Sequence, residues 1–431
     1  MGYFTKIKYA AVLLNVVVSS VFASQNEPSD AALYTLSIEN AVLTAQTNDP
    51  WLVGNQHSQD AIESMSIAAS TLPDPKMSIG LGNIAADSFD FNQEPMSQFK
   101  VEVSQMFPRG DSLELKKKQL QLTGSQYPFQ RKDRKAKVAV TAANLWLDAY
   151  KAQQSIVLIE KNRPLFEQLA DVAEASYSST IGRTRQQDIV RAQLELTRLD
   201  DRLSQLKQQQ EMAQQRLSEW LREPVNYRLS SELPNIILHQ ETPVFAQHPS
   251  VKALDQKIKA SSSDIDLAKQ KYQPQWGVNV GYGYRDAAPN GIDRSDLFSI
   301  GVSFDIPLFT ANRQDKEVQS AVSKTAAVKT EKWLLIQNLT AAYETNRAQF
   351  LRLNERQQLY KQRLLPQIHD QAEASLTAYT NDYGEFSEVV RARIAELNAE
   401  LDALSIDVDR QKNIIQLNYF FSNSDEEKSN G

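Results

Sequence analysis

The segment "WGVNVGYGYR", from Trp276 to Arg285, alternates between two kinds of side chain. Aromatic or aliphatic residues stand at every second position from Trp276 to Tyr284, and the positions between them hold glycine, asparagine and finally arginine. An alternation with a period of two is typical of a β-strand with unlike faces. Most of the remaining chain is rich in Gln, Leu, Ala, Glu and Lys, which favour helix. The sequence therefore predicts a mainly helical protein that keeps a strand with one apolar face.

Three further segments show the same alternation. "LFSIGVSFDIPLF" (297–309) follows the first strand after a polar, turn-rich stretch, so the two predict a β-hairpin with a long loop. "KMSIGLGNIA" (76–85) and "FKVEVSQMFP" (99–108) predict an earlier hairpin of the same kind. We therefore expect two β-hairpins, over residues 76–107 and 275–306.

A shift of 199 residues brings landmarks of the two hairpins into register. The same shift aligns "AEAS" at 173–176 with "AEAS" at 372–375, and one extra residue then aligns "VRA" at 190–192 with "VRA" at 390–392. The aligned prolines are Pro50 with Pro249, Pro75 with Pro274, and Pro108 with Pro307. The chain is therefore predicted to be two copies of one unit, helix–hairpin–long helix–helix.

The helical parts of each copy are long. Residues 112–177 would extend about 100 Å as a helix at 1.5 Å per residue, with Pro128 and Pro164 expected to kink or segment it. Two return helices carry apolar residues at heptad spacing, which predicts a coiled-coil seam and one long antiparallel helical hairpin in each copy. The seam residues are Leu196, Leu199, Leu203 and Leu206, and Val390, Ile394, Leu397, Leu401, Leu404 and Val408.

Composition excludes several classes of protein. The 431 residues include no cysteine, so disulfides, thiolate metal sites and cysteine nucleophiles are excluded. The four histidines are scattered, and we find no metal-ligand spacing, no cofactor motif and no nucleophile–base–orienter set. The net charge of −6 argues against nucleic-acid binding. We therefore expect no enzyme activity, no cofactor and no resident metal.

The first residues have the features of a secretory signal peptide. Lys6 and Lys8 precede an apolar run (9–18), and small residues at 21 and 23 place the expected cleavage after Ala23. Cleavage removes two of the 47 basic residues and none of the 53 acidic ones, so the net charge falls from −6 to −8. Without a cysteine, we expect no lipid anchor. The protein is predicted to be exported.

Strands of about ten residues have the length that crosses a bilayer in a barrel. Four strands cannot close a barrel, and small closed barrels begin near eight strands, so several chains would have to share one. The apolar face would then contact lipid, and the Gly/Asn face would line a lumen. The candidates for an aromatic girdle are Trp276, Tyr282, Tyr284 and Phe298. The alternative is a soluble protein whose hairpins pack on its helices.

Several motifs together resemble a family of outer-membrane channels. They are Asn48-Asp49-Pro50, "LPDPKMSIGLGN", "QEPMSQFKVEVSQMFPRGDSLELKKKQ", "FDIPLFTANRQDKEVQSA", "IGRTRQQDIVRAQLEL" and "YTNDYGEFSEVVRARIAEL". On these motifs the mature chain is similar to TolC-type outer-membrane efflux channels, and "SQMFPRGD" with "LTAYTNDYGEFSEVVRARIAEL" most resembles the branch serving heavy-metal RND systems. The resemblance implies a mostly α trimer that shares a twelve-stranded outer-membrane barrel, a helical tunnel in the periplasm, a periplasmic adaptor and an inner-membrane RND pump.

The resemblance also implies where the channel narrows. Its carboxylate positions match Asp188 and Glu388, and its aromatic position matches Tyr379. Threefold symmetry would form a ring of six carboxylates, which concentrates cations. The arginines that could pair with them are Arg183, Arg185 and Arg391. The alternative is that all of these are ordinary solvated charges at helix ends.

These expectations divide the chain as follows: a signal peptide (1–23), a first repeat (24–223), a linker (224–245), a second repeat (246–420) and a polar tail (421–431). The expected function is a passive efflux conduit, with heavy-metal cations as cargo. Two alternatives stay open. One is the same duct serving multidrug export or type I protein secretion, and the other is a periplasmic coiled-coil tether without a pore.

Overall fold

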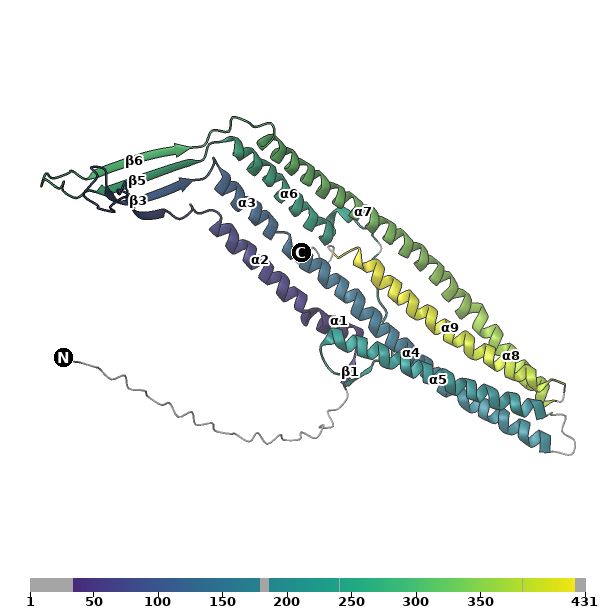
Figure 1. Ribbon diagram of the computed structural model, residues 1–431. Helices are drawn as coiled ribbons and strands as arrows, with labels where there is room; N and C mark the ends of the chain where they lie inside the picture. Colours follow the sequence, from purple (N-terminus) through teal and green to yellow (C-terminus); the bar gives the residue numbers. More distant parts are fainter. Residues whose placement is uncertain (1–33, 179–185, 240, 382, 423–431) are drawn as a thin grey trace, which may run out of the picture.

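The computed structural model describes residues 34–178, 186–239, 241–381 and 383–422. The expected signal peptide, Arg183, Arg185 and residues 423–431 of the expected tail lie outside this range. The molecule is elongated, with a small sheet at one end and the ends of paired helices at the other (Figure 1). It is mostly helical, with long helical hairpins, as the sequence predicts.

The same order of elements occurs twice along the chain. The first set is α1 (Ile38–Thr47), α2 (Pro50–Ala68), β2 (Lys76–Gly82), β3 (Gln98–Phe107), α3 (Ser112–Gly124), α4 (Tyr127–Ser178) and α5 (Gln186–Leu221). The second set is α6 (Pro249–Lys269), the 3-10 turn η2 (Gln270–Tyr272), β5 (Trp276–Tyr284), β6 (Leu297–Phe304), α7 (Gln314–Leu359), the π-helical turn η3 (Tyr360–Leu364), α8 (Leu365–Thr380) and α9 (Phe386–Tyr419). The four long strands lie within one residue of the start of the four alternating segments, but β6 ends at Phe304, so residues 305–309 of the last segment are not strand.

Prolines mark where helices begin. The Asn48-Asp49-Pro50 motif lies between α1 and α2 rather than within one helix, and Asp49 caps α2 by accepting a hydrogen bond from the Trp51 backbone N–H. The helix is interrupted just before Pro128, because α3 ends at Gly124 and α4 begins at Tyr127. In contrast, α4 continues through Pro164, which therefore does not segment it. Proline lacks the N–H that a helix interior needs but is tolerated in the first turn.

Two short strands were not foreseen from the sequence. β1 (Tyr34–Leu36) pairs in parallel with β4 (Tyr227–Leu229), which lies in the segment expected to be a linker. The buried Trp146 indole of α4 donates a hydrogen bond to the Leu36 carbonyl, at 3.0 Å. Three residues are too few to show a periodic pattern, so these strands depend on the surrounding core.

The predicted heptad seams are confirmed as buried interfaces. Leu199 and Leu203 of α5 share one apolar cluster with Leu397 and Leu401 of α9, together with Ile159 of α4. A second cluster, nearer the hairpin ends, joins Leu169 and Ala173 of α4 to Phe386, Val389 and Val390 of α9. The two helical hairpins are thus packed on each other as well as within themselves. Among the described helices, none is long and apolar enough to cross a membrane.

Candidate channel surfaces: the sheet and the hairpin ends

The two predicted hairpins form one four-stranded antiparallel sheet. Its order is β2-β3-β5-β6, so β3 and β5 join the two repeats, and β2 and β6 are the edges. The register keeps residues of one kind together across the strands. One row runs Ile79–Val101–Tyr282–Phe298, and the neighbouring row runs Ser78–Glu102–Gly281–Ser299. In these two rows each face of the sheet has a single chemical character across all four strands.

Large side chains on the apolar face of the sheet are exposed to solvent in the single chain. Phe298 is 71% exposed and Ile79 is 63% exposed, although both are large and apolar. Aromatic residues occur on this face at two levels. Trp276 stacks at a tilt on Phe304, with ring centroids 5.2 Å apart, at the end next to the helices, and Tyr282, Tyr284 and Phe298 lie near the far end. All four girdle candidates thus lie on one face.

The distance between these levels suits a bilayer. Trp276 and Tyr284 are eight positions apart, which corresponds to about 26 Å along a strand. The apolar band of membrane barrels is about 25 Å tall and is flanked by aromatic residues at both interfaces. Between the two levels the face carries aliphatic side chains, including Val280, Ile300 and Val302.

The opposite face is built from glycines that neighbouring side chains cover. A Cβ on Gly277 would lie 2.6 Å from the Ser303 hydroxyl and 2.8 Å from the Met106 sulfur. A Cβ on Gly281 would lie 2.7 Å from the Ser299 hydroxyl. The glycines of β5 therefore make room for side chains of β3 and β6, among them the hydroxyls of Ser299 and Ser303, which agrees with a water-facing surface.

An ion pair ties the two repeats together where the sheet meets the helices. The Arg109 guanidinium contacts the Asp305 carboxylate and donates a hydrogen bond to the Gln273 carbonyl at 2.6 Å. The other Asp305 oxygen accepts a hydrogen bond from the Gln275 backbone N–H at 2.7 Å. Arg109 follows β3 and Asp305 follows β6, so the two motifs that leave the hairpins meet in space.

At the other end of the molecule, the two motif carboxylates differ in environment. Asp188, in the first turn of α5, is only 8% exposed. Glu388, in the first turn of α9, is exposed and forms an ion pair with Arg391, at 2.8 Å. Tyr379 is half-buried and packs on Phe386, with ring centroids 5.6 Å apart. The structure therefore contains the expected Glu388–Arg391 pair, but it does not present the two acids alike.

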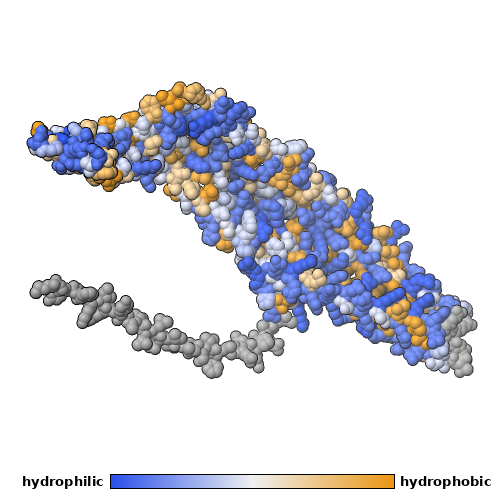
Figure 2. All heavy atoms as spheres, in the orientation of Figure 1, coloured by the Kyte–Doolittle hydropathy of each residue, from blue (hydrophilic) through white to orange (hydrophobic). Residues whose placement is uncertain are grey.

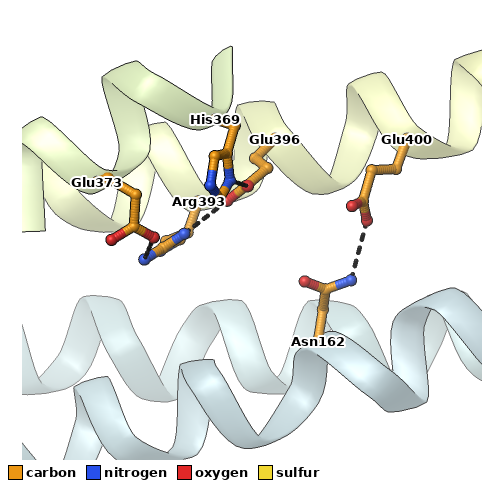
Figure 3. Close-up of polar contacts among 6 residues, drawn as sticks. All are labelled: Asn162, His369, Glu373, Arg393, Glu396 and Glu400. Carbon is orange, nitrogen blue, oxygen red and sulfur yellow. Dashed lines mark hydrogen bonds and ion pairs between the residues drawn. The ribbon is translucent and has the colours of Figure 1, made fainter. Parts of the chain in front are cut away.

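A polar cluster near these ends was missed by sequence reasoning. The buried Arg393 guanidinium of α9 pairs with Glu373 of α8 at 2.7 Å and with Glu396 at 2.8 Å. The Nδ1 atom of His369 on α8 lies 2.6 Å from the other Glu396 oxygen (Figure 3). Hydrogen bonds make His369 more basic and Glu373 more acidic: Glu396 raises the pKa of His369, and Arg393 lowers the pKa of Glu373. The cluster joins α8 to α9.

The first repeat lacks this cluster. Ala170, Gln193 and Leu196 stand at the positions equivalent to His369, Arg393 and Glu396. A second polar link shown in Figure 3 joins the two hairpins, because the Asn162 amide of α4 donates to Glu400 of α9 at 3.1 Å. The feature of the sequence that could have indicated the Arg393 cluster is the presence of this basic residue on the buried side of the α9 seam. Within the described ranges, no three His, Asp or Glu side chains are grouped as metal ligands.

Comparison with known proteins agrees with these features. Residues 244–419 match the family described as outer membrane efflux protein. No curated protein matches the sequence significantly. The structure of CusC is similar over 92% of this chain and 95% of that chain, with 14% identity and a TM-score of 0.76.

Two further solved structures show the same likeness. The open state of the Neisseria gonorrhoeae MtrE outer membrane channel is 13% identical, with a TM-score of 0.74 over 89% of this chain and 88% of that one. The outer membrane protein VceC from Vibrio cholerae is 10% identical, with a TM-score of 0.72 over 89% and 96%. At such identities the likeness establishes the fold. The chain therefore has the fold of these outer-membrane channels, and residues 244–419 match the outer membrane efflux protein family.

Proposed function

We propose that three copies of the chain form the outer-membrane channel of a tripartite efflux system. The observation that carries this proposal is the four-stranded sheet with two unpaired edges, β2 and β6. An open edge in lipid leaves backbone groups without hydrogen bonds, so only a closed barrel satisfies them. Three copies supply twelve strands, which is an ordinary size for such a barrel.

The directions of the edge strands support this closure. Each neighbouring pair in the sheet is antiparallel, so β2 and β6 run in opposite directions. The β6 edge of one copy therefore meets the β2 edge of the next as an antiparallel pair, which continues the pattern of the sheet. The apolar face would contact lipid, with Trp276, Tyr282, Tyr284 and Phe298 at its borders, and the glycine-rich face would line the lumen.

The long helices would extend into the periplasm as a tunnel. There the hairpin ends would meet a periplasmic adaptor protein, which connects the channel to an inner-membrane RND pump. In this proposal the channel is passive, and the pump supplies the energy. Asp188, Glu388, Tyr379 and Arg391 are proposed to line the narrow end, and Arg185 is proposed from its sequence motif alone.

The closure of the barrel between copies can be tested with pairs of introduced cysteines, because the sequence contains no native cysteine. One cysteine replaces Ile79 on β2, and the second replaces Phe298, Ile300 or Val302 in turn on β6, on the same face. Oxidation of membranes should give a cross-linked trimer for at least one pair, whereas each single variant should stay monomeric on a denaturing gel. Recovery of the protein as a soluble monomer would favour the tether without a pore.

We propose heavy-metal cations as the cargo. Support comes from the motifs that leave the first hairpin and mark the second hairpin end, which resemble the heavy-metal branch. A structural likeness at 13–14% identity supports the fold alone, so the cargo proposal depends on these motifs. A deletion strain, with the pump expressed, would be challenged with metals, antibiotics and dyes. Loss of tolerance to metals alone, restored by the gene, is the expected outcome; loss of tolerance to drugs alone would favour multidrug export.

A further inference from the structure

A pocket of about 380 Å³ lies where the sheet meets the helices. It is bounded by the turn after β3, by η2, and by the beginning of α7, three segments that converge at this end of the molecule (Figure 1). The polar residues that line it and matter here are Arg109, Gln270, Lys271, Arg313, Gln314 and Glu317. The pocket combines cationic groups with buried acceptors, so a ligand that fits it has to satisfy both.

The cationic groups outnumber the acidic one. Among the residues that line the pocket, Arg109, Lys271 and Arg313 are positive and Glu317 alone is negative. Arg109 is neutralised by Asp305, and Lys271 pairs with Glu317 at 2.9 Å. Arg313 is exposed, and its guanidinium has no ion-pair partner in the part of the chain that the structure describes. An anion at this position would therefore meet a guanidinium that is still available.

Two acceptor atoms are enclosed in the same pocket without a hydrogen bond. Gln314 is only 8% exposed, and its Oε1 atom has no partner among the described residues. The Glu317 Oε2 atom is also enclosed; Lys271 neutralises it, but not in hydrogen-bond geometry. Buried acceptors are nearly always satisfied in native proteins. A ligand that fits this pocket would therefore carry hydrogen-bond donors as well as negative charge.

The pocket lies at the level that the channel proposal gives to lipid headgroups. It is next to the Trp276 end of the sheet, the aromatic level nearest the helices. The connection from β6 to α7 carries an exposed apolar patch, visible in Figure 2, which includes Ile306, Leu308 and Phe309, the last being 89% exposed. If the sheet crosses the membrane as proposed above, this patch contacts acyl chains, and the pocket faces the headgroups of the periplasmic leaflet.

We propose that this pocket binds the headgroup of a phospholipid that carries N–H or O–H donors. The phosphate lies against Arg109 and Arg313, and an ammonium or hydroxyl of the headgroup donates to Gln314 Oε1 and to the Glu317 carboxylate. Phosphatidylethanolamine and phosphatidylglycerol meet both requirements. Phosphatidylcholine has the same phosphate but no donor, so it satisfies only half of the site. The lipid would anchor each copy at the base of the barrel.

Native mass spectrometry of the delipidated full-length protein in detergent would test this site. The three lipids, with identical acyl chains, are titrated separately. We expect the ethanolamine and glycerol lipids to bind about ten-fold more tightly than the choline lipid, as hydrogen bonds to charged groups would predict. Gln314→Met should abolish this preference, and Arg313→Gln should weaken all three lipids about ten-fold. Arg347→Gln, on an exposed part of the same helix, is the matched control and should change nothing.

Competition experiments separate the possible sources of the anion. Soluble glycerophosphoethanolamine should displace the lipid, whereas inorganic phosphate should not. Equal displacement by inorganic phosphate, equal affinity for all three lipids, or an unchanged affinity in Arg313→Gln would each overturn the proposal. The same spectra report the number of copies. A trimer without lipid preference would refute the pocket and leave the shared barrel standing. A monomer would refute the shared barrel, and lipid binding could still be measured on it because the pocket is built within one copy.

Discussion

The His369 imidazole and the Glu396 carboxylate lie 2.6 Å apart and join α8 to α9. Glu396 also pairs with the buried Arg393, and Glu373 pairs with Arg393 from the α8 side. The groups that face His369 are therefore two carboxylates, from α8 and α9, and one guanidinium. The equivalent position in the first repeat is Ala170, so the first hairpin has no histidine at the matching place.

This link predicts that the second hairpin loosens as the pH rises. The pKa of His369 is raised by the hydrogen bond to Glu396, so the pair contributes stability below the ordinary histidine pKa of 6.5. That contribution is lost as the pH increases through the raised value. His369→Gln should lower the thermal unfolding midpoint at pH 5.5 and have little effect at pH 9, as followed by circular dichroism. A uniform loss at both pH values would mean that only packing was removed. His57→Gln, exposed on α2, is the control.

His248 predicts the opposite dependence on pH. It begins α6, is 2% exposed, and packs against the Tyr419 ring at 4.9 Å. Burial lowers the pKa of His248, and the positive charge of Lys137 lowers it further. The negative charge of Asp133 and a hydrogen bond to the Tyr419 backbone carbonyl act in the opposite direction. The unfolded chain therefore binds a proton near pH 6.5 when the folded chain does not, and stability falls as the pH falls below 6.5.

His248→Asn should reduce this sensitivity to acid while it keeps a side chain that can cap α6. The wild-type free energy of unfolding should decrease by at most about 1.4 kcal/mol per pH unit below 6.5 from this group. Unfolding midpoints measured between pH 5 and 7 should therefore have a shallower slope in the variant. An unchanged slope would assign the acid sensitivity to other groups, and His57→Asn provides the comparison.

The exposed acid at the hairpin end should affect ion passage more than the buried one. Glu388→Gln leaves Arg391 without its partner, so each copy changes by one positive unit at the proposed aperture. Planar-bilayer recordings should then show weaker cation preference, and Asp188→Asn should add a smaller change. Glu355→Gln removes an exposed acid from a similar arginine pair on α7 and should have no effect. Unchanged selectivity in the Glu388→Gln, Asp188→Asn double variant would mean that neither acid controls ion passage.

Gly281 should not tolerate a large side chain. A Cβ there meets the Ser299 hydroxyl at 2.7 Å, so Gly281→Leu has to displace β6 or its side chains. Overpacking of this kind costs about 1–3 kcal/mol. We expect fewer assembled trimers in membranes, measured by gel mobility without heating. Val280→Leu places the same side chain on the opposite, apolar face and should assemble normally. Equal assembly of both variants would contradict the packing seen on the glycine face.

Local periodicity allowed the individual elements to be predicted from the sequence. The strand from Trp276 to Tyr284 and the seam from Val390 to Val408 lie where their periods of two and of 3.5 place them, because each pattern reflects which neighbours bury one face. The repeat was visible for the same reason, since two similar segments must satisfy similar neighbours. A family resemblance in the motifs then indicated the fold.

The tertiary structure alone decided which distant groups meet. The sequence predicted two hairpins, but not that β3 pairs with β5, nor that β1 and β4 pair across almost 200 residues. It did not reveal the Arg393 cluster or the pocket around Gln314, and it treated Asp188 and Glu388 as equivalents although one is buried and the other exposed. Pairing, burial and charge neutralisation depend on packing between segments far apart in the chain, and no local period records that packing.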